Sequence, residues 1–398
     1  MMVKSSCDGL ALFGGQPLFD LPRSTSSLVQ PDFERFLEYS RTFYEAHQFT
    51  NNGPLVQQLE RRLAEFHQTS HCVTFCSGFW ALVLAIKCLA LPGRREIVMP
   101  SLTYRRMADV AAWADLVPRF CDVDPQTLAL SADTVRPHLN EQTALILGVH
   151  PIMNCCDAVG LEALAEESGI PLFIDAVESV YETYAGRKVG SFGRAECFSL
   201  HASKLLNGFE GGYVTTNDAE LAAKLVRMRG FGFYTPDNVQ ELGMNAKLNE
   251  VHAAMALAGL DGLDAQVACN RERYLAYRRE LTGLPGVRLV EFDESEQSGF
   301  KNILIELLDD WPLSRAQTLS LLNAERILAR AYYSPALHQK PTDYPTIGGS
   351  LPVTERLAER FVLLPCGHFV DEQDIHAIVA MLGFVHGHAA ELRQRIAV

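Results

Sequence analysis

Short apolar runs alternate with segments of helical spacing from about residue 70 onward. The runs have the length of buried strands, about 4–8 residues, and are bounded by turn-forming residues. They predict strands at 72–76, 96–100, 117–122, 143–150, 171–175, 196–201 and 212–216. Helical patterns lie at 54–67, 80–91, 105–114 and 161–168. This alternation predicts an α/β fold, with a seven-stranded, mostly parallel sheet covered by helices on both faces.

The pattern weakens toward both ends of the chain. Residues 1–50 carry scattered Pro and Gly, so we expect an irregular N-terminal arm. A long helical pattern at 248–263 leads out of the sheet region. The remainder is more charged but keeps candidate strands and helices at 286–291, 301–306, 315–322 and 372–382. We therefore expect a large domain over 51–263 and a small α+β domain over 264–398.

Composition excludes several classes of function. The 398 residues are enough for two domains with a large core, and 48% hydrophobic with 21% charged residues is ordinary for a globular enzyme. The formal net charge is −13 and no basic block occurs, so we expect no nucleic-acid partner. Apolar runs stay shorter than the roughly 18 residues of a membrane span, so we expect no membrane association.

The ten cysteines lack the paired spacing of a metal site, and we expect no metal. Cys155 and Cys156 are adjacent, and the start of the chain does not resemble a signal peptide. We therefore expect reduced thiols and a cytoplasmic location. Disulfides in a secreted protein are the weaker alternative.

Two predicted strand ends carry the most informative residues. The segment Leu172-Phe-Ile-Asp-Ala176 is a buried strand that ends in Asp175, and Phe198-Ser-Leu-His-Ala-Ser-Lys204 is a strand followed by a turn with Lys204. Ligands of such sheets bind at the carboxyl ends of strands. A lysine that forms a Schiff base with an aldehyde, and an acid that keeps a pyridine nitrogen protonated, are what pyridoxal 5'-phosphate (PLP) requires. The pair predicts a PLP enzyme with Lys204 as its catalytic residue. A solvated lysine and a helix-capping aspartate are the alternatives.

Other residues could bind the rest of this cofactor. The turn Cys76-Ser-Gly-Phe-Trp80 joins a strand to a helix, and Gly78 would let backbone N–H groups approach a phosphate. Ser199 could add a hydroxyl, and Tyr104 lies just past a strand end, where it could stack on a flat ring. Each signal is weak alone, because Ser-Gly turns and surface tyrosines are common.

With these residues assembled, the chain resembles the DegT/StrS-type sugar aminotransferases, which are PLP-dependent transferases of fold type I. The resemblance covers nearly the whole chain. It is carried by Ser199-Leu-His-Ala-Ser-Lys204 with Glu210-Gly-Gly212, Gly243-Met-Asn-Ala-Lys-Leu-Asn-Glu-Val-His-Ala-Ala254, Gly14-Gly-Gln-Pro17, Thr50-Asn-Asn-Gly-Pro54 and Tyr332-Tyr-Ser-Pro-Ala-Leu-His338.

The resemblance implies transfer of an amino group from glutamate or glutamine to a carbonyl. The acceptor would be a nucleotide-linked keto sugar, a cyclitol or a related natural-product intermediate. It also implies site residues: Lys204 would carry PLP, Asp175 would pair with the pyridine nitrogen, Tyr104 would stack on the ring, and Gly78, Phe79 (through its backbone) and Ser199 would hold the phosphate. Asn245 would reach the phosphate of the neighbouring subunit, which implies a homodimer with shared active sites.

The chain departs from the family pattern at four places, three of them near the expected cofactor. Glu178 replaces a Gln or His beside the phenolic oxygen, where a carboxylate is unfavourable unless protonated or paired with a cation. Phe79 replaces a Thr or Ser, Arg105 and Arg106 replace small residues, and His150-Pro-Ile-Met153 replaces His-Leu-Tyr-Gly.

These departures suggest an unusual substrate or altered chemistry. One hypothesis is that Arg105 or Arg106 pairs with Glu178, or binds a substrate carboxylate or phosphate; two exposed arginines are the alternative. Further candidates for substrate contacts are His150, Tyr333 and His338. Two other functions stay open: a PLP enzyme with non-transaminating chemistry, such as carbon–carbon bond formation or elimination, and a PLP-binding regulatory protein. The intact Lys204 argues against the family's sugar 3-dehydratases, which lack that lysine.

Overall fold

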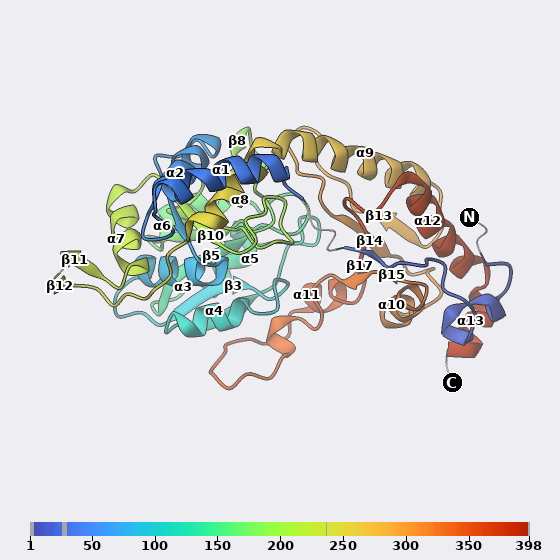
Figure 1. The fold of residues 1–398 in the computed structure, drawn as a ribbon. Helices are drawn as coiled ribbons and strands as arrows, with labels where there is room; N and C mark the ends of the chain where they lie inside the picture. The colour runs from blue at the N-terminus through green and yellow to red at the C-terminus, as the bar shows by residue number, and fades with distance from the viewer. Residues whose placement is uncertain (1–3, 26–29, 236, 397–398) are drawn as a thin grey trace.

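A seven-stranded sheet forms the centre of the first half of the molecule (Figure 1). The computed structural model describes residues 4–25, 30–235 and 237–396. The strands are β2 (His71–Phe75), β10 (Gly212–Thr216), β9 (Ala195–Ser199), β6 (Leu172–Asp175), β5 (Thr143–Val149), β3 (Glu96–Pro100) and β4 (Val117–Cys121), in that spatial order. Strand β10 is antiparallel to both of its neighbours, β2 and β9, and the remaining neighbouring pairs in this sheet are parallel. The predicted mostly parallel sheet is confirmed.

Helices cover both faces of this sheet, and alternate strand residues point to opposite layers. Ile146 of β5 packs in the same core cluster as helices α2 (Pro54–Phe66), α6 (Ala158–Ser168) and α8 (Glu250–Asp261). Leu145 and Leu147 pack in the other cluster, with α3 (Gly78–Leu89), α4 (Met107–Trp113) and α7 (Ala219–Arg229). Because both faces are covered, β5 and β6 are apolar at consecutive positions, such as residues 144–147 and 172–174, rather than at every second one.

A smaller antiparallel sheet lies beside the first (Figure 1). Its order is β13 (Val287–Leu289), β14 (Ile303–Leu307), β17 (Phe361–Leu364) and β16 (Arg330–Ala331). Helix α9 (Leu263–Leu281) follows α8 and runs alongside α12 (Glu372–Gly387) over this sheet. Helix α10 (Arg315–Ala324) contacts β16 and β17 of the same sheet. The expected strands and helices of this region are present, together with β16, β17 and α9, which the pattern did not indicate.

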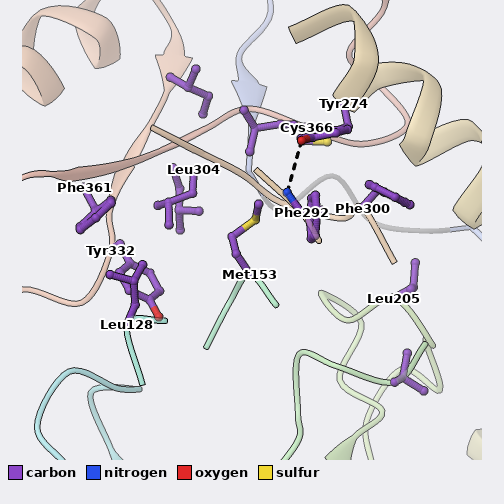
Figure 2. Packing of buried hydrophobic residues seen from close by; sticks show 14 of the residues in the cluster. Leu128, Met153, Leu205, Tyr274, Phe292, Phe300, Leu304, Tyr332, Phe361 and Cys366 are labelled. Atoms are coloured by element: carbon purple, nitrogen blue, oxygen red, sulfur yellow. Dashed lines mark hydrogen bonds between the residues drawn. The ribbon is translucent and has the colours of Figure 1, made fainter. Parts of the chain in front are cut away.

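An aromatic cluster joins α9 to the segment that leads into β14 (Figure 2). The ring of Phe300 lies 5.4 Å from that of Tyr274 and 4.8 Å from that of Phe292, measured between centroids. The backbone N–H of Phe292 donates a hydrogen bond to the Tyr274 hydroxyl. These buried contacts fix the backbone immediately before β14.

The expectation of an irregular arm over residues 1–50 was wrong for much of its described part. Helix α1 (Phe33–Glu45) packs against α8, and β1 (Arg23–Ser24) pairs in parallel with β15 (Ile327–Leu328). The carboxylate of Glu325 accepts hydrogen bonds from the backbone N–H groups of Ala11 and Leu18, both at 2.7 Å. These partners are some 300 residues apart in sequence, so no local pattern could indicate them.

Three further findings concern the cysteines, metal binding and membrane-spanning helices. All ten cysteines are free, as expected. In the described ranges, no cluster of three or more His, Cys, Asp or Glu side chains could hold a metal ion. No single described helix is long and apolar enough to cross a membrane, whereas α12 and α13 (Ala389–Ile396) would pass such a test together but are bent by 82°.

Candidate active site

A cavity of about 390 Å³ opens at the carboxyl ends of β6 and β9. Eight of the predicted site residues line it: Lys204, Asp175, Tyr104, Gly78, Phe79, Ser199, Glu178 and Tyr333. The other lining residues are Ser77, Leu82, Met107, Val110, Val177, His201, Ser203 and Glu210. Two larger surface cavities, of about 690 and 470 Å³, are lined by neither Lys204 nor Asp175. The cavity of about 390 Å³ is therefore the candidate active site.

Asp175 is the last residue of β6, in the middle of the sheet, and is 1% exposed. Its Oδ1 accepts a hydrogen bond from the N–H of Val177 at 3.0 Å. Burial raises the pKa of Asp175 to about 6, while the positive charge of Lys204 opposes the increase. The carboxylate is therefore mostly ionised above neutral pH, and it lies where it could hold a cationic ring nitrogen.

Lys204 contacts a carboxylate on the cavity wall. Its Nζ forms an ion pair with Oε1 of Glu178, which lies three residues after Asp175. The other oxygen of Glu178, Oε2, lies 3.1 Å from Nζ of Lys301. Burial favours the protonated form of Glu178, yet the two lysines together lower its pKa to about 2. Glu178 is thus an ionised carboxylate shared by two amines.

This arrangement corrects the hypothesis that an arginine neutralises Glu178. Arg105 and Arg106 are exposed, and Arg106 pairs with Asp109 at 3.0 Å, one turn along its own helix. Neither arginine lines the cavity. The cation comes instead from Lys301, which precedes β14. Sequence reasoning missed it because a lysine at the start of a predicted strand carries no local mark of function.

The N-terminus of α3 faces the same cavity and could bind a phosphate. Helix α3 begins at Gly78, and the hydroxyl of Ser77 caps it by accepting from the N–H of Trp80 at 3.3 Å. Backbone N–H groups of a first helical turn attract anions. A Cβ at Gly212 would lie 2.5 Å from Cα and N of Gly78, so only glycine allows β10 to approach this turn.

Hydroxyl groups and aromatic rings complete this part of the cavity. Ser199 accepts a hydrogen bond from the N–H of His201 at 3.2 Å, and its Cβ would lie 3.2 Å from a Cβ at Gly78. Tyr104 is half exposed at the opening, and Tyr333 reaches in from the region after β16. Ser77 is a lining hydroxyl that sequence reasoning passed over, although its helix-capping position was a usable signal. Together these groups fit PLP, because one cavity holds anion donors at a helix N-terminus, a buried acid and an amine.

Two predicted substrate residues lie away from the cavity. His150 is buried, and its Nδ1 accepts from the N–H of Cys156 at 3.2 Å while its Nε2 lies 3.4 Å from Glu196. Glu196 precedes Cys197, whose register partner is Asp175, so Glu196 and Asp175 point to opposite faces of the sheet. His338 lies between Ser101, at 2.7 Å, and Glu355, at 3.1 Å. Both histidines have structural partners.

Asn245 also lies outside the cavity of its own chain. It is exposed on the loop before α8, and its backbone bridges to that of Gly230. A contact between Asn245 and the cofactor of a neighbouring subunit stays a prediction.

Comparison with known proteins agrees with this geometry. The model of the DegT/DnrJ/EryC1/StrS aminotransferase family matches residues 32–383. A dTDP-4-amino-4,6-dideoxy-D-glucose transaminase from Shigella dysenteriae is 29% identical over 307 residues, which cover 77% of this chain and 83% of that protein. An L-glutamine:2-deoxy-scyllo-inosose aminotransferase from Micromonospora echinospora is 36% identical over 226 residues, covering 53% of this chain and 54% of that protein.

Among solved structures, DesI in the presence of its TDP-sugar product matches with a TM-score of 0.93 and 34% identity, over 99% of this chain and 100% of that chain. The matches favour transamination over the non-transaminating and regulatory alternatives. The chain therefore belongs to the DegT/DnrJ/EryC1/StrS aminotransferase family and is a PLP-dependent aminotransferase of fold type I.

Proposed function

We propose that this enzyme transfers an amino group from glutamate or glutamine to a ketone of a nucleotide-linked sugar or a cyclitol. The observation that carries the proposal is the similarity to DesI, which extends over 99% of the chain and whose structure was solved with a TDP-sugar product. The named relatives, a sugar-nucleotide transaminase and a scyllo-inosose aminotransferase, support a polyhydroxylated ketone as acceptor.

Lys204 is the proposed catalytic residue. PLP, when bound, supplies an electrophilic aldehyde and a ring that accepts electrons. Lys204 lines the cavity together with Asp175, and its Nζ pairs with Glu178, so this amine is placed to bind the aldehyde carbon. After an amino donor displaces this amine, its Nζ can take a proton from the donor carbon and return it.

The other lining residues bind and orient the cofactor in this proposal. Asp175 holds the pyridine nitrogen in its protonated form, because an ionised acid in a buried site favours the cation. The N–H groups of Gly78 and Phe79, with the hydroxyls of Ser77 and Ser199, hold the phosphate. Tyr104 stacks on the ring. Binding of a substrate phosphate by Arg105 or Arg106 stays a prediction.

The proposal is tested by following the absorbance of the PLP-loaded enzyme as amino donors and then ketones are added. We expect L-glutamate or L-glutamine to convert the bound cofactor to its amine form, and a dTDP-linked 4-keto sugar or a keto cyclitol to reverse the change. A simple keto acid supplies the control for reversal without a sugar acceptor. If keto acids reverse the change but no keto sugar or keto cyclitol of a panel does, the result would contradict the proposed acceptor class.

We further propose a homodimer in which Asn245 serves the cofactor phosphate of the partner subunit. Mixing Lys204→Ala and Asn245→Ala protomers tests this. If the sites are shared, each hybrid dimer has one site with both residues intact, so about one quarter of wild-type activity should return after equal mixing. If Asn245 acts within its own chain, both sites of every hybrid lack one residue and activity stays near that of the parents. Light scattering of each variant checks that dimers form.

The remaining proposals concern location and domain boundaries. Ten free thiols support a reducing, cytoplasmic location. The break between α8, which ends at Asp261, and α9, which begins at Leu263, supports a boundary between a large domain over 51–263 and a small domain over 264–398.

A further inference from the structure

The second lysine at the active site has no role in the reaction described above. Lys301 lies outside the cavity lining, behind Glu178, and its side chain is 17% exposed. In the part of the chain that the structure describes, Glu178 is the one acidic side chain within ion-pair distance of Lys301. Glu178 in turn contacts Lys204 through its other oxygen. The Glu178 carboxylate thus bridges the amine of Lys204 and the amine of Lys301, which lies outside the cavity lining.

The backbone around Lys301 is tied to several separate elements. The carbonyl of Gly299 accepts a hydrogen bond from the side chain of Asn270 at 3.1 Å, and the N–H of Gly299 donates to Glu182 at 3.1 Å. On the other side, the amide of Asn302 donates to the carbonyl of Ile152 at 3.3 Å.

The aromatic cluster adds to this anchoring. The ring of Phe300, immediately before Lys301, packs against Tyr274 and Phe292 (Figure 2). Lys301 is therefore held in place from α9, from the loop after β6 and from the loop after β5, rather than lying on a free strand end.

Lys204 and Lys301 have different roles during the reaction. The amine of Lys204 must bind the cofactor and then release it, so its ion pair with Glu178 changes during every turnover. Lys301 does not bind and release the cofactor, so its ion pair with Glu178 can persist. A buried carboxylate that lost its only cation would take up a proton or move. Lys301 prevents both while Lys204 is engaged elsewhere.

We propose that Lys301 is a positioning residue that acts through Glu178: it keeps that carboxylate ionised and aimed at Lys204 throughout the reaction. Lys301 would have this role with any acceptor, because the role requires only the PLP chemistry of the family. It does not depend on the proposed sugar or cyclitol substrate.

Neighbouring titratable groups do not obscure a test above neutral pH. Asp175 is already ionised there, since its pKa is about 6. Burial raises the pKa of Tyr333 well above its ordinary value, and burial raises the pKa of the Cys366 thiol, beside Lys301, to about 11. Glu178 is likewise ionised in this range, because the two lysines lower its pKa to about 2.

The experiment is a pH titration of the absorbance of the PLP-loaded enzyme without substrate, for wild type, Lys301→Met, Lys301→Arg, Glu178→Gln and the double variant Lys301→Met/Glu178→Gln. In wild type, Glu178 stays paired with Lys301 when the nitrogen of Lys204 loses its proton, whereas in Lys301→Met this loss leaves the buried carboxylate with no cation, which is unfavourable. The nitrogen of Lys204 should then hold its proton to higher pH, and the absorbance midpoint should rise by about one pH unit. Lys301→Arg keeps the charge and should restore most of the wild-type midpoint.

The double variant distinguishes positioning through Glu178 from other roles. With Glu178→Gln in place, the Lys301→Met change should move the midpoint by less than about a third of its effect in the wild-type background, because the shared carboxylate is gone. An equal effect in both backgrounds, or no midpoint change in Lys301→Met, would overturn the proposal.

Two further measurements cover variants that fold poorly. Melting of each apoprotein identifies a purely structural role, which would lower the melting temperature and leave the midpoint unchanged, and so overturn the proposal. The pH profile of reductive methylation of Lys204, read by mass spectrometry on the apoprotein, should show the same upward shift in Lys301→Met. Lys188→Met is the matched control, because Lys188 is a buried lysine that contacts the rings of Phe66 and Tyr181; its midpoint should equal that of wild type.

Discussion

Replacing Lys204 with alanine should lower kcat at least about 10³-fold with any donor and acceptor, because the change removes both the amine that binds the cofactor and the group that moves the proton. The structure places this side chain on the cavity wall near Asp175, with Glu178 as its ion-pair partner. The measurement is single-turnover conversion of the loaded variant with saturating L-glutamate or L-glutamine, followed by absorbance.

Two comparisons make this result specific to Lys204. The Lys204→Arg variant keeps the positive charge beside Glu178 but supplies no amine of suitable basicity, so we expect it to be about as inactive as Lys204→Ala. Borohydride treatment should attach the cofactor covalently to Lys204 in the wild-type enzyme and to no lysine in Lys204→Ala. Attachment to Lys301 in the variant would show that the second lysine can reach the cavity, contrary to its position behind Glu178.

The Asp175→Asn variant should have opposite effects on activity and on stability. An amide cannot keep the pyridine nitrogen protonated, so kcat should fall about 10²-fold or more. In the apoprotein, burial has raised the pKa of Asp175 from 3.8 to about 6. An acid with a raised folded-state pKa contributes stability at low pH, and this contribution is lost as the pH rises through about 6. The neutral amide avoids the cost of a buried charge, so the variant apoprotein should be more stable at pH 8 by up to about 3 kcal/mol.

Urea denaturation of the two apoproteins at pH 8 and near pH 4 measures this effect. The stability advantage of the variant should shrink toward zero at the lower pH, where Asp175 is protonated in the folded and much of the unfolded chain. An advantage of equal size at both pH values would show that packing rather than ionisation is responsible. Asp218→Asn is a control, because Asp218 is the half-buried N-cap of α7 and its replacement should not stabilise the apoprotein at pH 8.

Much of the candidate site was predictable from local sequence. Asp175 and Lys204 follow apolar strands of one parallel sheet, and strands that run in parallel bring their carboxyl ends to the same edge. Gly78 and Ser199 lie next to further strand ends at that edge, and the structure places all four residues around one cavity. A strand order was not needed for this prediction, because the strand direction alone sets the edge.

Several candidates that are close to the site in sequence lie outside the cavity. His150 follows a strand that ends at the same edge, yet its ring points to the opposite face and pairs with Glu196. Arg105 and Arg106 are close in sequence to Tyr104, but lie outside the cavity. Nearness along the chain does not determine the face on which a side chain lies, whereas the pleat and the register of the strands do.

By itself, then, the sequence determined the fold class, the cofactor and the candidate pair Asp175 and Lys204, because strand periodicity and a short lysine motif are local properties. Only the tertiary structure decided how the unusual Glu178 is neutralised. Lys301 is 123 residues away in sequence, and it reaches Glu178 because the aromatic cluster and the hydrogen bonds around Gly299 place the start of β14 beside the loop after β6. An ion pair between two such segments depends on how the segment before β14 contacts the loops after β5 and β6, which no periodicity in either segment encodes.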